Sequence, residues 1–221
     1  MDRADFFNLL YPLQDEVLRV LRGLETGLYL TGGTAASRGY LNHRYSDDLD
    51  LFVNDDPQFL LWAERLIQGL SGHGTWSVQI LLREQRFVRL NLVAETTQLK
   101  IELVNDVPAH VGEITMHPVL GRLDSAENIL ANKVTALVDR EEPKDFADIW
   151  GFCRRLGLSL AAALEGAQSK AAGIFPADLA RLLCTAETSD WQLVRWIEAP
   201  SSDQYLTDLR RLGEELILPE R

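Results

Sequence analysis

Cysteine, long apolar runs and excess positive charge are all lacking in this 221-residue chain. Its two cysteines, Cys153 and Cys184, have no CxxC spacing, which argues against a disulfide framework and against a zinc site. No apolar stretch approaches the length of a membrane-spanning segment, and residues 1–5 lack a basic region followed by an apolar run. We therefore expect a cytoplasmic protein with no membrane partner.

The net charge of −11 is unfavourable for general nucleic-acid binding. Such binding depends on Lys and Arg side chains that displace the counterions condensed on a polyanion, so a broad nucleic-acid surface is not expected. A nucleic-acid end remains open as a substrate, because a few local cations and a bound metal ion reverse the sign of the potential within one cleft.

The hydrophobic pattern changes character near residue 123. Before that point helical and strand patterns alternate, whereas almost only helical periods follow it. We predict an α+β protein with an α/β domain at 1–123 and a helical domain at 124–221 packed against it. The predicted strands cover residues 28–30, 49–53, 75–82, 87–93 and 99–104. The predicted helices cover 5–24 with a break or a restart near Pro12, 34–40, 59–70, 124–140 with a capping box at 124–127, 143–155, 158–168, 176–186, 191–199 and 202–216.

A glycine turn followed by two aspartates is the most informative pattern. Side chains two apart in a strand point the same way, so Asp48 and Asp50 present two carboxylates together. Mg²⁺ prefers such oxygen ligands, with Mn²⁺ as an alternative. In the Gly32-Gly33-Thr34 turn, the glycines allow backbone N–H groups to approach a phosphate, and the following helix aims its positive end at the same anion. Together these features predict a site for a metal-bound nucleoside triphosphate.

Each half of this pattern also has an ordinary interpretation. A Gly-Gly turn alone is usually only a turn, and an Asp-x-Asp pair is often a solvated strand end, so the weight lies on their combination. The acidic segment 47–50 concentrates negative charge, which lowers stability unless a cation or a basic side chain neutralises it. The nearby candidates are Arg44 and Arg38.

A two-metal phosphoryl-transfer site needs a third carboxylate, and Glu102 is the best candidate. It alternates with Ile101 and Leu103 in the predicted strand 99–104, so it faces away from the apolar side. A solvent-facing strand residue is its alternative interpretation. Weaker candidates for the same role are Glu95, Asp106 and Glu113.

Charged residues also recur on two predicted helices downstream. Lys133 and Arg140 are seven apart, hence nearly on one helical face, and such a pair suits a triphosphate. Asp145 and Asp148 share a face of the next helix. For these two aspartates a direct role, a favourable position at the helix N-terminus, and pairing with Lys133 or Arg140 all remain open. The four histidines, including His43, have no metal-ligand spacing and are interpreted as structural.

These residues, taken in order, resemble the AbiEii/AbiGii toxin family of the DNA polymerase β-like nucleotidyltransferases over about residues 28–152. The resemblance rests on Gly32-Gly33-Thr34, residues 44–50, Lys100-Ile101-Glu102, Asn132-Lys133 and residues 140–149. It implies a polymerase β-like core with a mixed sheet, followed by a helical C-terminal region. It also implies an enzyme that transfers a nucleoside monophosphate from a nucleoside triphosphate to an acceptor hydroxyl.

The resemblance further implies roles for particular residues. The metal-binding and catalytic residues would be Asp48, Asp50 and Glu102. The nucleotide-binding residues would be Gly32, Gly33, Thr34, Arg44, Ser46, Lys133, Arg140, Asp145 and Asp148. The implied setting is a type IV toxin–antitoxin or abortive-infection system, with tRNA as the acceptor and a cognate antitoxin encoded nearby. The alternatives are an aminoglycoside-like small molecule or a protein as the acceptor, and a non-catalytic nucleotide-binding protein.

Overall fold

The computed structural model describes residues 3–217, which divide into two compact units. Unit 1 consists of the described residues up to Ala35, Ser46–Pro108 and Glu113–Asp124. Unit 2 consists of Ala36–Tyr45, Ala109–Gly112 and the described residues from Ser125 onward. The chain therefore enters unit 2 twice before the point near residue 123 at which the sequence changes character.

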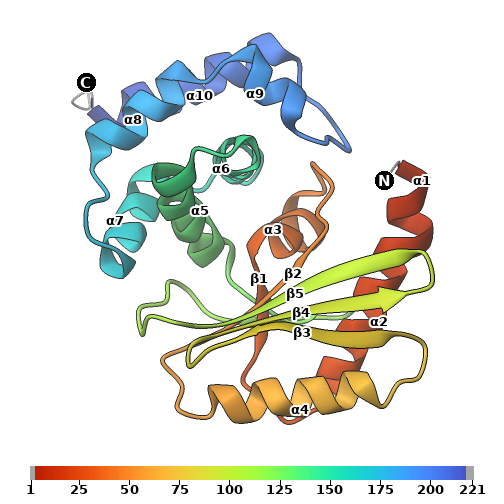
Figure 1. Ribbon diagram of the computed structural model, residues 1–221. Helices are drawn as coiled ribbons and strands as arrows, with labels where there is room; N and C mark the ends of the chain where they lie inside the picture. The colour runs from red at the N-terminus through yellow and green to blue at the C-terminus, as the bar shows by residue number, and fades with distance from the viewer. Residues whose placement is uncertain (1–2, 218–221) are drawn as a thin grey trace. The chain divides into compact units, whose positions relative to one another are not determined.

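Unit 1 is built on a seven-stranded mixed sheet with the strand order β3-β4-β5-β2-β1-β7-β6 (Figure 1). The strands are β1 (Tyr29–Thr31), β2 (Leu49–Asn54), β3 (Ser77–Arg83), β4 (Phe87–Ala94), β5 (Thr97–Asp106), β6 (Thr115–His117) and β7 (Gly121–Leu123). β2 runs parallel to β5 and β1 runs parallel to β7, while the other neighbours are antiparallel. The fold is therefore α+β, as the sequence predicted.

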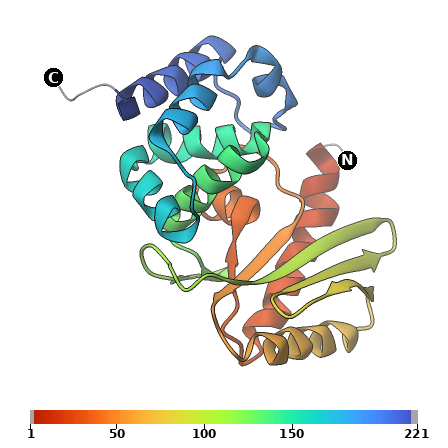
Figure 2. The ribbon, with the colours of Figure 1, turned by 60° about the vertical axis from the view of Figure 1, so that its left-hand side comes forward.

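The helices of unit 1 are α1 (Arg3–Asp5), the π-helix η1 (Phe6–Leu10), α2 (Tyr11–Arg22), α3 (Gly32–Thr34) and α4 (Phe59–Ser71). Helix α4 runs along the β3–β4–β5 part of the sheet (Figure 2). α4 also packs on α2, where the absence of a side chain at Gly69 leaves room for Val20 and Leu24. The core beneath the sheet is apolar because alternate residues of β2, β4 and β5 are buried on one face.

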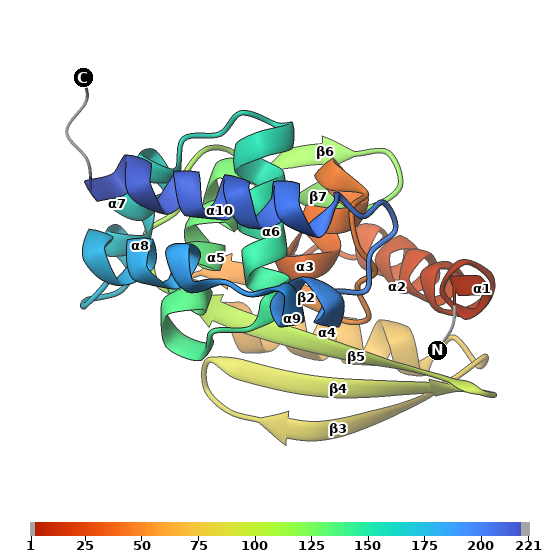
Figure 3. The ribbon, with the colours of Figure 1, turned by 90° about the horizontal axis from the view of Figure 1, so that it is seen from above.

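Unit 2 is helical. It contains most of the π-helix η2 (Ala35–Leu41), together with α5 (Ala126–Arg140), α6 (Pro143–Arg155), α7 (Leu160–Lys170), α8 (Pro176–Thr185), α9 (Thr188–Leu193) and α10 (Ser202–Ile217). α8 and α10 lie side by side (Figure 3). A Cβ on Gly213 would lie 2.8 Å from the Ala180 carbonyl oxygen and from Cys184 Sγ, so glycine allows these two helices to approach closely.

Most predicted elements are confirmed, with ends shifted by a few residues. The first helix restarts near Pro12, which is one of the two predicted alternatives: η1 ends at Leu10 and α2 begins at Tyr11, with Pro12 in its first turn, where no N–H is needed. Three details are wrong. Strands β6 and β7 were not predicted, and the helix predicted at 191–199 ends at Leu193. The N-cap of α5 is Ser125, which accepts from Asn128 N–H, rather than Asp124. Within residues 3–217, no helix is both long and apolar enough to cross a membrane.

Candidate active site

The three predicted metal-binding carboxylates lie on two neighbouring parallel strands of unit 1. Asp48 immediately precedes β2, Asp50 is the second residue of that strand, and Asp50 pairs in register with Glu102 of β5. Their neighbours Leu49 and Ile101 are also paired in register and are fully buried. Because side chains alternate along a strand, Asp50 and Glu102 project together from the opposite face.

The glycine turn directly adjoins one of these carboxylates. Gly32 has φ +67°, and a Cβ at this position would lie 2.0 Å from Asp50 Oδ2. Glycine is therefore required both for the left-handed backbone and for the space that the carboxylate occupies. Gly33 and Thr34 complete the short helix α3, which begins at Gly32.

The loop that carries Asp48 is held by buried polar side chains. Thr34 Oγ1 lies 3.0 Å from Ser46 Oγ and donates to the Asp48 carbonyl oxygen. From α2, Gln14 Nε2 donates to the carbonyl oxygens of Ser46 at 3.2 Å and Asp47 at 3.1 Å. These bonds fix the backbone of Ser46–Asp48 relative to the glycine turn.

Two cationic side chains form ion pairs with Asp48 and Glu102. Lys100 Nζ lies 2.8 Å from Asp48 Oδ2 and 3.3 Å from Glu102 Oε1, and Arg89 on β4 donates to the same Glu102 oxygen at 2.8–2.9 Å. Burial alone would lower the pKa of Lys100, but the two carboxylates outweigh it and raise the pKa. Arg44, one of the two cations predicted near this acidic segment together with Arg38, pairs with Asp148 in unit 2.

The donor set suits a hard divalent cation such as Mg²⁺. Asp48, Asp50 and Glu102 offer only carboxylate oxygens, which are the ligands that Mg²⁺ prefers. Over residues 3–217, no three Asp, Glu, His or Cys side chains converge closely enough to enclose a metal ion. In the candidate site the ammonium of Lys100 lies between Asp48 and Glu102. The three side chains therefore match Mg²⁺ in the chemistry of their oxygens, and a metal ion that binds Asp48 and Glu102 has to displace Lys100.

The charged residues predicted downstream form a buried ion cluster within unit 2. Lys133 Nζ on α5 lies 2.8 Å from Asp145 Oδ1 and 2.7 Å from Asp148 Oδ2, both on α6. The guanidinium of Arg44 holds both oxygens of Asp148 at 2.7 Å. Burial by itself would raise the pKa of Asp148, but Arg44 and Lys133 hold this pKa well below its usual range. The interpretation that Asp148 pairs with Lys133 is thus confirmed.

Arg140 and His43 complete the ion cluster. Arg140 Nε donates to Asp145 Oδ2 at 2.8 Å, so the pair of cations predicted on one face of α5 meets at one carboxylate. His43 Nε2 lies 2.9 Å from Asp148 Oδ1, and burial lowers the pKa of this imidazole. The ring is therefore neutral, with Nε2–H as the donor to Asp148.

A family model described as "Nucleotidyl transferase AbiEii toxin, Type IV TA system" matches residues 17–207. The chain belongs to this AbiEii family. The sequence-based resemblance is confirmed, and with it the assignment to the nucleotidyltransferase toxins. No curated protein matches the chain.

Solved structures share the fold of this AbiEii-family protein. It is similar to JHP933 from Helicobacter pylori, with a TM-score of 0.63 and 17% identity over 93% of this chain and 90% of that one. It is also similar to MenT4, a nucleotidyltransferase toxin from Mycobacterium tuberculosis, with a TM-score of 0.67 and 16% identity over 96% of this chain and 84% of that one. At such identities the likeness extends to the fold alone.

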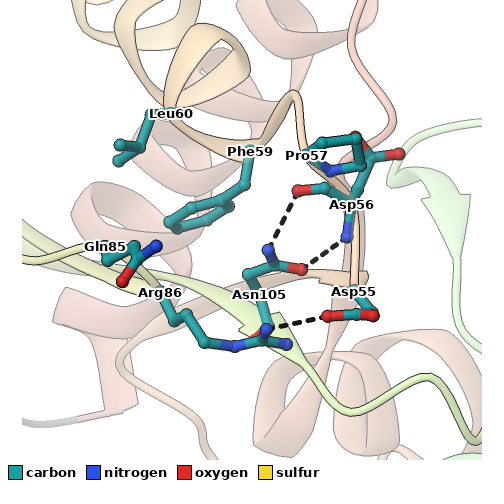
Figure 4. Close-up of a pocket in the computed structure, with 8 residues that line it drawn as sticks. All are labelled: Asp55, Asp56, Pro57, Phe59, Leu60, Gln85, Arg86 and Asn105. Atoms are coloured by element: carbon teal, nitrogen blue, oxygen red, sulfur yellow. Dashed lines mark hydrogen bonds and ion pairs between the residues drawn. The ribbon is translucent and has the colours of Figure 1, made fainter.

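Figure 4 shows a pocket elsewhere in unit 1 of this AbiEii protein, and its lining residues do not include Asp48, Asp50 or Glu102. It has a volume of about 350 Å³ and lies at the C-terminal ends of β2 and β5, whereas Asp48 and Asp50 lie at the start of β2. Several of its polar side chains are already paired: Arg86 binds Asp55 at 2.7 Å, and the Asn105 amide bonds twice to the backbone of Asp56. The pocket is therefore not part of the candidate active site.

Sequence reasoning missed Lys100, Arg89 and Gln14 as parts of the site. Lys100 lies two residues from Glu102 on the same strand, so the face from which it projects was predictable, although its partner Asp48 was not. Arg89 is in register with Glu102 across β4 and β5, which requires the strand pairing to be known. The available signal for Gln14 was a polar residue on the apolar face of α2, where it is fully buried.

Proposed function

We propose that this AbiEii protein is an Mg²⁺-dependent nucleotidyltransferase that transfers a nucleoside monophosphate from a nucleoside triphosphate to an acceptor hydroxyl. The observation that carries the proposal is the position of Asp50 and Glu102, in register on one face of parallel strands, beside a glycine turn that leaves room for Asp50. Asp48 joins them through the shared contact with Lys100.

In this proposal the residues of unit 1 hold the reacting groups. Asp48, Asp50 and Glu102 would hold Mg²⁺, which would supply charge stabilisation for the phosphates and a lower pKa for the acceptor hydroxyl. The backbone N–H groups of Gly32 and Gly33 approach the phosphates, which Cβ atoms would prevent. The acceptor oxygen bonds to the α-phosphorus, the bond from that phosphorus to the bridging oxygen breaks, and pyrophosphate leaves with that electron pair. The acceptor hydroxyl loses its proton to solvent water.

The proposed nucleotide-binding residues of unit 2 differ in how accessible they are. Arg140 has 42% of its side chain exposed. Lys133 is only 7% exposed, and its ammonium holds Asp145 and Asp148. We assign phosphate contact first to Arg140. Arg44 and Lys133 fix Asp145 and Asp148, so the four act together as one ionic support for nucleotide binding.

We assign the acceptor hydroxyl to a tRNA end and the biological role to growth inhibition that a cognate antitoxin relieves. Membership of a type IV toxin–antitoxin family supports this role. The net charge of −11 also favours an acceptor bound at one end over a polyanion bound along a broad surface.

The direct test incubates the purified protein with Mg²⁺, total cellular RNA and each α-³²P-labelled nucleoside triphosphate in turn. The double variant Asp48→Ala/Asp50→Ala is the inactive control, and Arg83→Met, on a strand away from the carboxylates, is the active one. We expect label in tRNA-sized RNA with the wild type and Arg83→Met only. Transfer to an aminoglycoside or a protein instead would move the acceptor to that class, and nucleotide binding without any transfer would support a non-catalytic protein.

The toxin role is tested separately by growth after induced expression. Arrest that Asp48→Ala abolishes is the expected outcome. Normal growth with the wild type at the same protein level would contradict the toxin role and leave the transferase chemistry to be judged by the labelling assay.

A further inference from the structure

Lys100 occupies the position in the candidate active site where a bound cation would be expected. Its ammonium contacts Asp48 Oδ2 at 2.8 Å and Glu102 Oε1 at 3.3 Å, so one positive charge joins carboxylates from β5 and from the start of β2. The side chain projects from β5 on the same face as Glu102, two residues away. The site therefore has its own counter-charge before any ligand binds.

A metal ion and the ammonium of Lys100 compete for the same oxygens. Mg²⁺ needs direct contact with carboxylate oxygen, and two cations a few ångströms apart repel each other strongly in a partly buried site. Lys100 therefore has to leave before Asp48 and Glu102 can bind a metal ion. Its flexible four-carbon side chain, 39% exposed, permits such a movement.

Arg89 differs from Lys100 in the contacts it makes. Arg89 lies in register with Glu102 on the adjacent strand, and both its Nε and its terminal nitrogen bind Glu102 Oε1. No contact from Arg89 to Asp48 is found in the described structure. Arg89 can thus keep Glu102 oriented when Lys100 moves, so displacing Lys100 need not disorder the third carboxylate.

We propose that Lys100 is an internal counter-cation that keeps free metal ions weakly bound and couples their entry to that of the nucleotide. This inference rests on the proposed function, since it assumes that Asp48 and Glu102 bind a metal ion. A triphosphate brings several negative oxygens, and a phosphate oxygen is a strong partner for the displaced ammonium. Nucleotide binding therefore offsets the contacts that Lys100 loses, and metal and nucleotide bind with positive coupling.

The experiment measures the affinity of the whole protein for Mn²⁺ alone, by isothermal titration calorimetry and by the loss of the free-ion EPR signal. The variants are Lys100→Met, Lys100→Gln, Lys100→Arg and the matched control Arg83→Met, which removes one positive charge at an exposed pair with Glu64 in the same unit. We expect Lys100→Met and Lys100→Gln to bind Mn²⁺ at least about tenfold more tightly than the wild type, because a competing charge is gone. Lys100→Arg should stay near the wild type, and Arg83→Met should change the affinity by less than about twofold.

The coupling itself is measured by repeating the titration with an α,β-methylene analogue of ATP at saturating concentration. The analogue should tighten Mn²⁺ binding more in the wild type than in Lys100→Met. Circular dichroism and thermal unfolding establish that each variant is folded, and Lys100→Gln replaces Lys100→Met if the latter is not.

The outcomes separate the two proposals. In one outcome, Asp48→Ala/Asp50→Ala abolishes Mn²⁺ binding, but neither Lys100→Met nor Lys100→Gln tightens it. This result would overturn the proposal that Lys100 is a counter-cation, and it would leave the proposed metal site intact. Binding that is absent from the wild type and from every Lys100 variant, or that survives in Asp48→Ala/Asp50→Ala, would overturn the proposed metal site and this inference with it.

Discussion

Gly32 and Asp50 are placed so that a single added carbon would disturb the candidate active site. The Cβ of any other residue at position 32 would lie 2.0 Å from Asp50 Oδ2, far inside the contact distance, and the backbone has φ +67°. Gly74 provides a comparison in the same unit. It has φ +76° and no atom within 4 Å of its would-be Cβ.

The comparison of Gly32 with Gly74 predicts different outcomes for the same glycine-to-alanine substitution at the two positions. Gly32→Ala and Gly74→Ala should both carry the strain of a left-handed alanine, about 1 kcal/mol. Gly32→Ala should lose about 2 kcal/mol more of the free energy of unfolding, because the new methyl group displaces a carboxylate. It should also abolish nucleotidyl transfer. Urea unfolding and the labelling assay measure both effects, and equal losses of stability in the two variants would contradict the steric argument.

At the scale of elements, helices α5 and α6 are joined by charges that are almost completely buried. Asp145 and Asp148 have side chains with no exposed area, and Lys133 on α5 contacts both. Removing one partner of a buried pair leaves the other charge without compensation, which costs far more than breaking an exposed pair. Lys144 and Glu142 form such an exposed pair at 2.8 Å at the start of α6.

Lys133→Met should therefore lower the free energy of unfolding by about 3 kcal/mol or more. Lys144→Met removes the same charge from an exposed pair, so it should change the free energy by less than about 1 kcal/mol. Chemical denaturation followed by tryptophan fluorescence compares them. Similar small losses in both variants would show that the ion cluster does not hold α5 on α6.

The same ion cluster predicts how stability depends on pH. The pKa values of Asp145 and Asp148 are lowered in the folded protein, with Asp148 held well below the ordinary value of 3.8. A lowered folded-state pKa means that the unfolded chain binds protons first as the pH falls. The stabilisation is complete above the ordinary carboxyl pKa and is lost progressively below it.

Urea midpoints should accordingly be insensitive to Asp148 ionisation near pH 5 and above, and should fall as the pH drops below about 3.8. Asp148→Asn should be less stable at pH 5 and should show a shallower decline towards acid. Midpoints measured at several values between pH 3 and pH 6 test this, and parallel curves for the two proteins would contradict the assignment to Asp148.

At the scale of the whole molecule, the chain contributes early residues to the later unit. Residues 36–45 belong to unit 2, where Arg44 and His43 bind Asp148. Tyr45 N–H donates to the Arg195 carbonyl at 2.8 Å, and Ile197 N–H donates to the His43 carbonyl at 2.9 Å. A cut near residue 123 therefore separates these residues from all of these partners.

A fragment of residues 1–124 should in consequence lack the cooperative unfolding of the full chain. It would leave Arg44 and His43 without the carboxylate that they bind in unit 2, and unpaired buried polar groups are costly. Urea denaturation and the dispersion of amide signals in a ¹⁵N-correlated NMR spectrum compare the fragment with the full chain. A well-dispersed spectrum with a cooperative transition would show that the first 124 residues fold on their own.

The elements that sequence reasoning predicted well depend on local patterns. The alternation in β2 and β5 placed Asp50 and Glu102 on the polar faces of their strands, and the helical periods of α4, α6 and α10 were within a few residues of the observed ends. Such periods show which side of an element is buried, and they can be recognised from the spacing of apolar residues within a short window of sequence. Strands β6 and β7, each three residues long, are too short to show a period.

The sequence by itself determined the fold class, the family and the order of the charged motifs, because each of these depends on local patterns within short segments of the chain. Only the tertiary structure decided which charges meet. Arg44 and Arg38 were the cations predicted near the acidic segment 47–50; in the structure Arg44 binds Asp148, and the ammonium beside Asp48 belongs to Lys100. Partners so distant in sequence are selected by strand register and helix packing, because a buried charge must find a counter-charge wherever the fold places one.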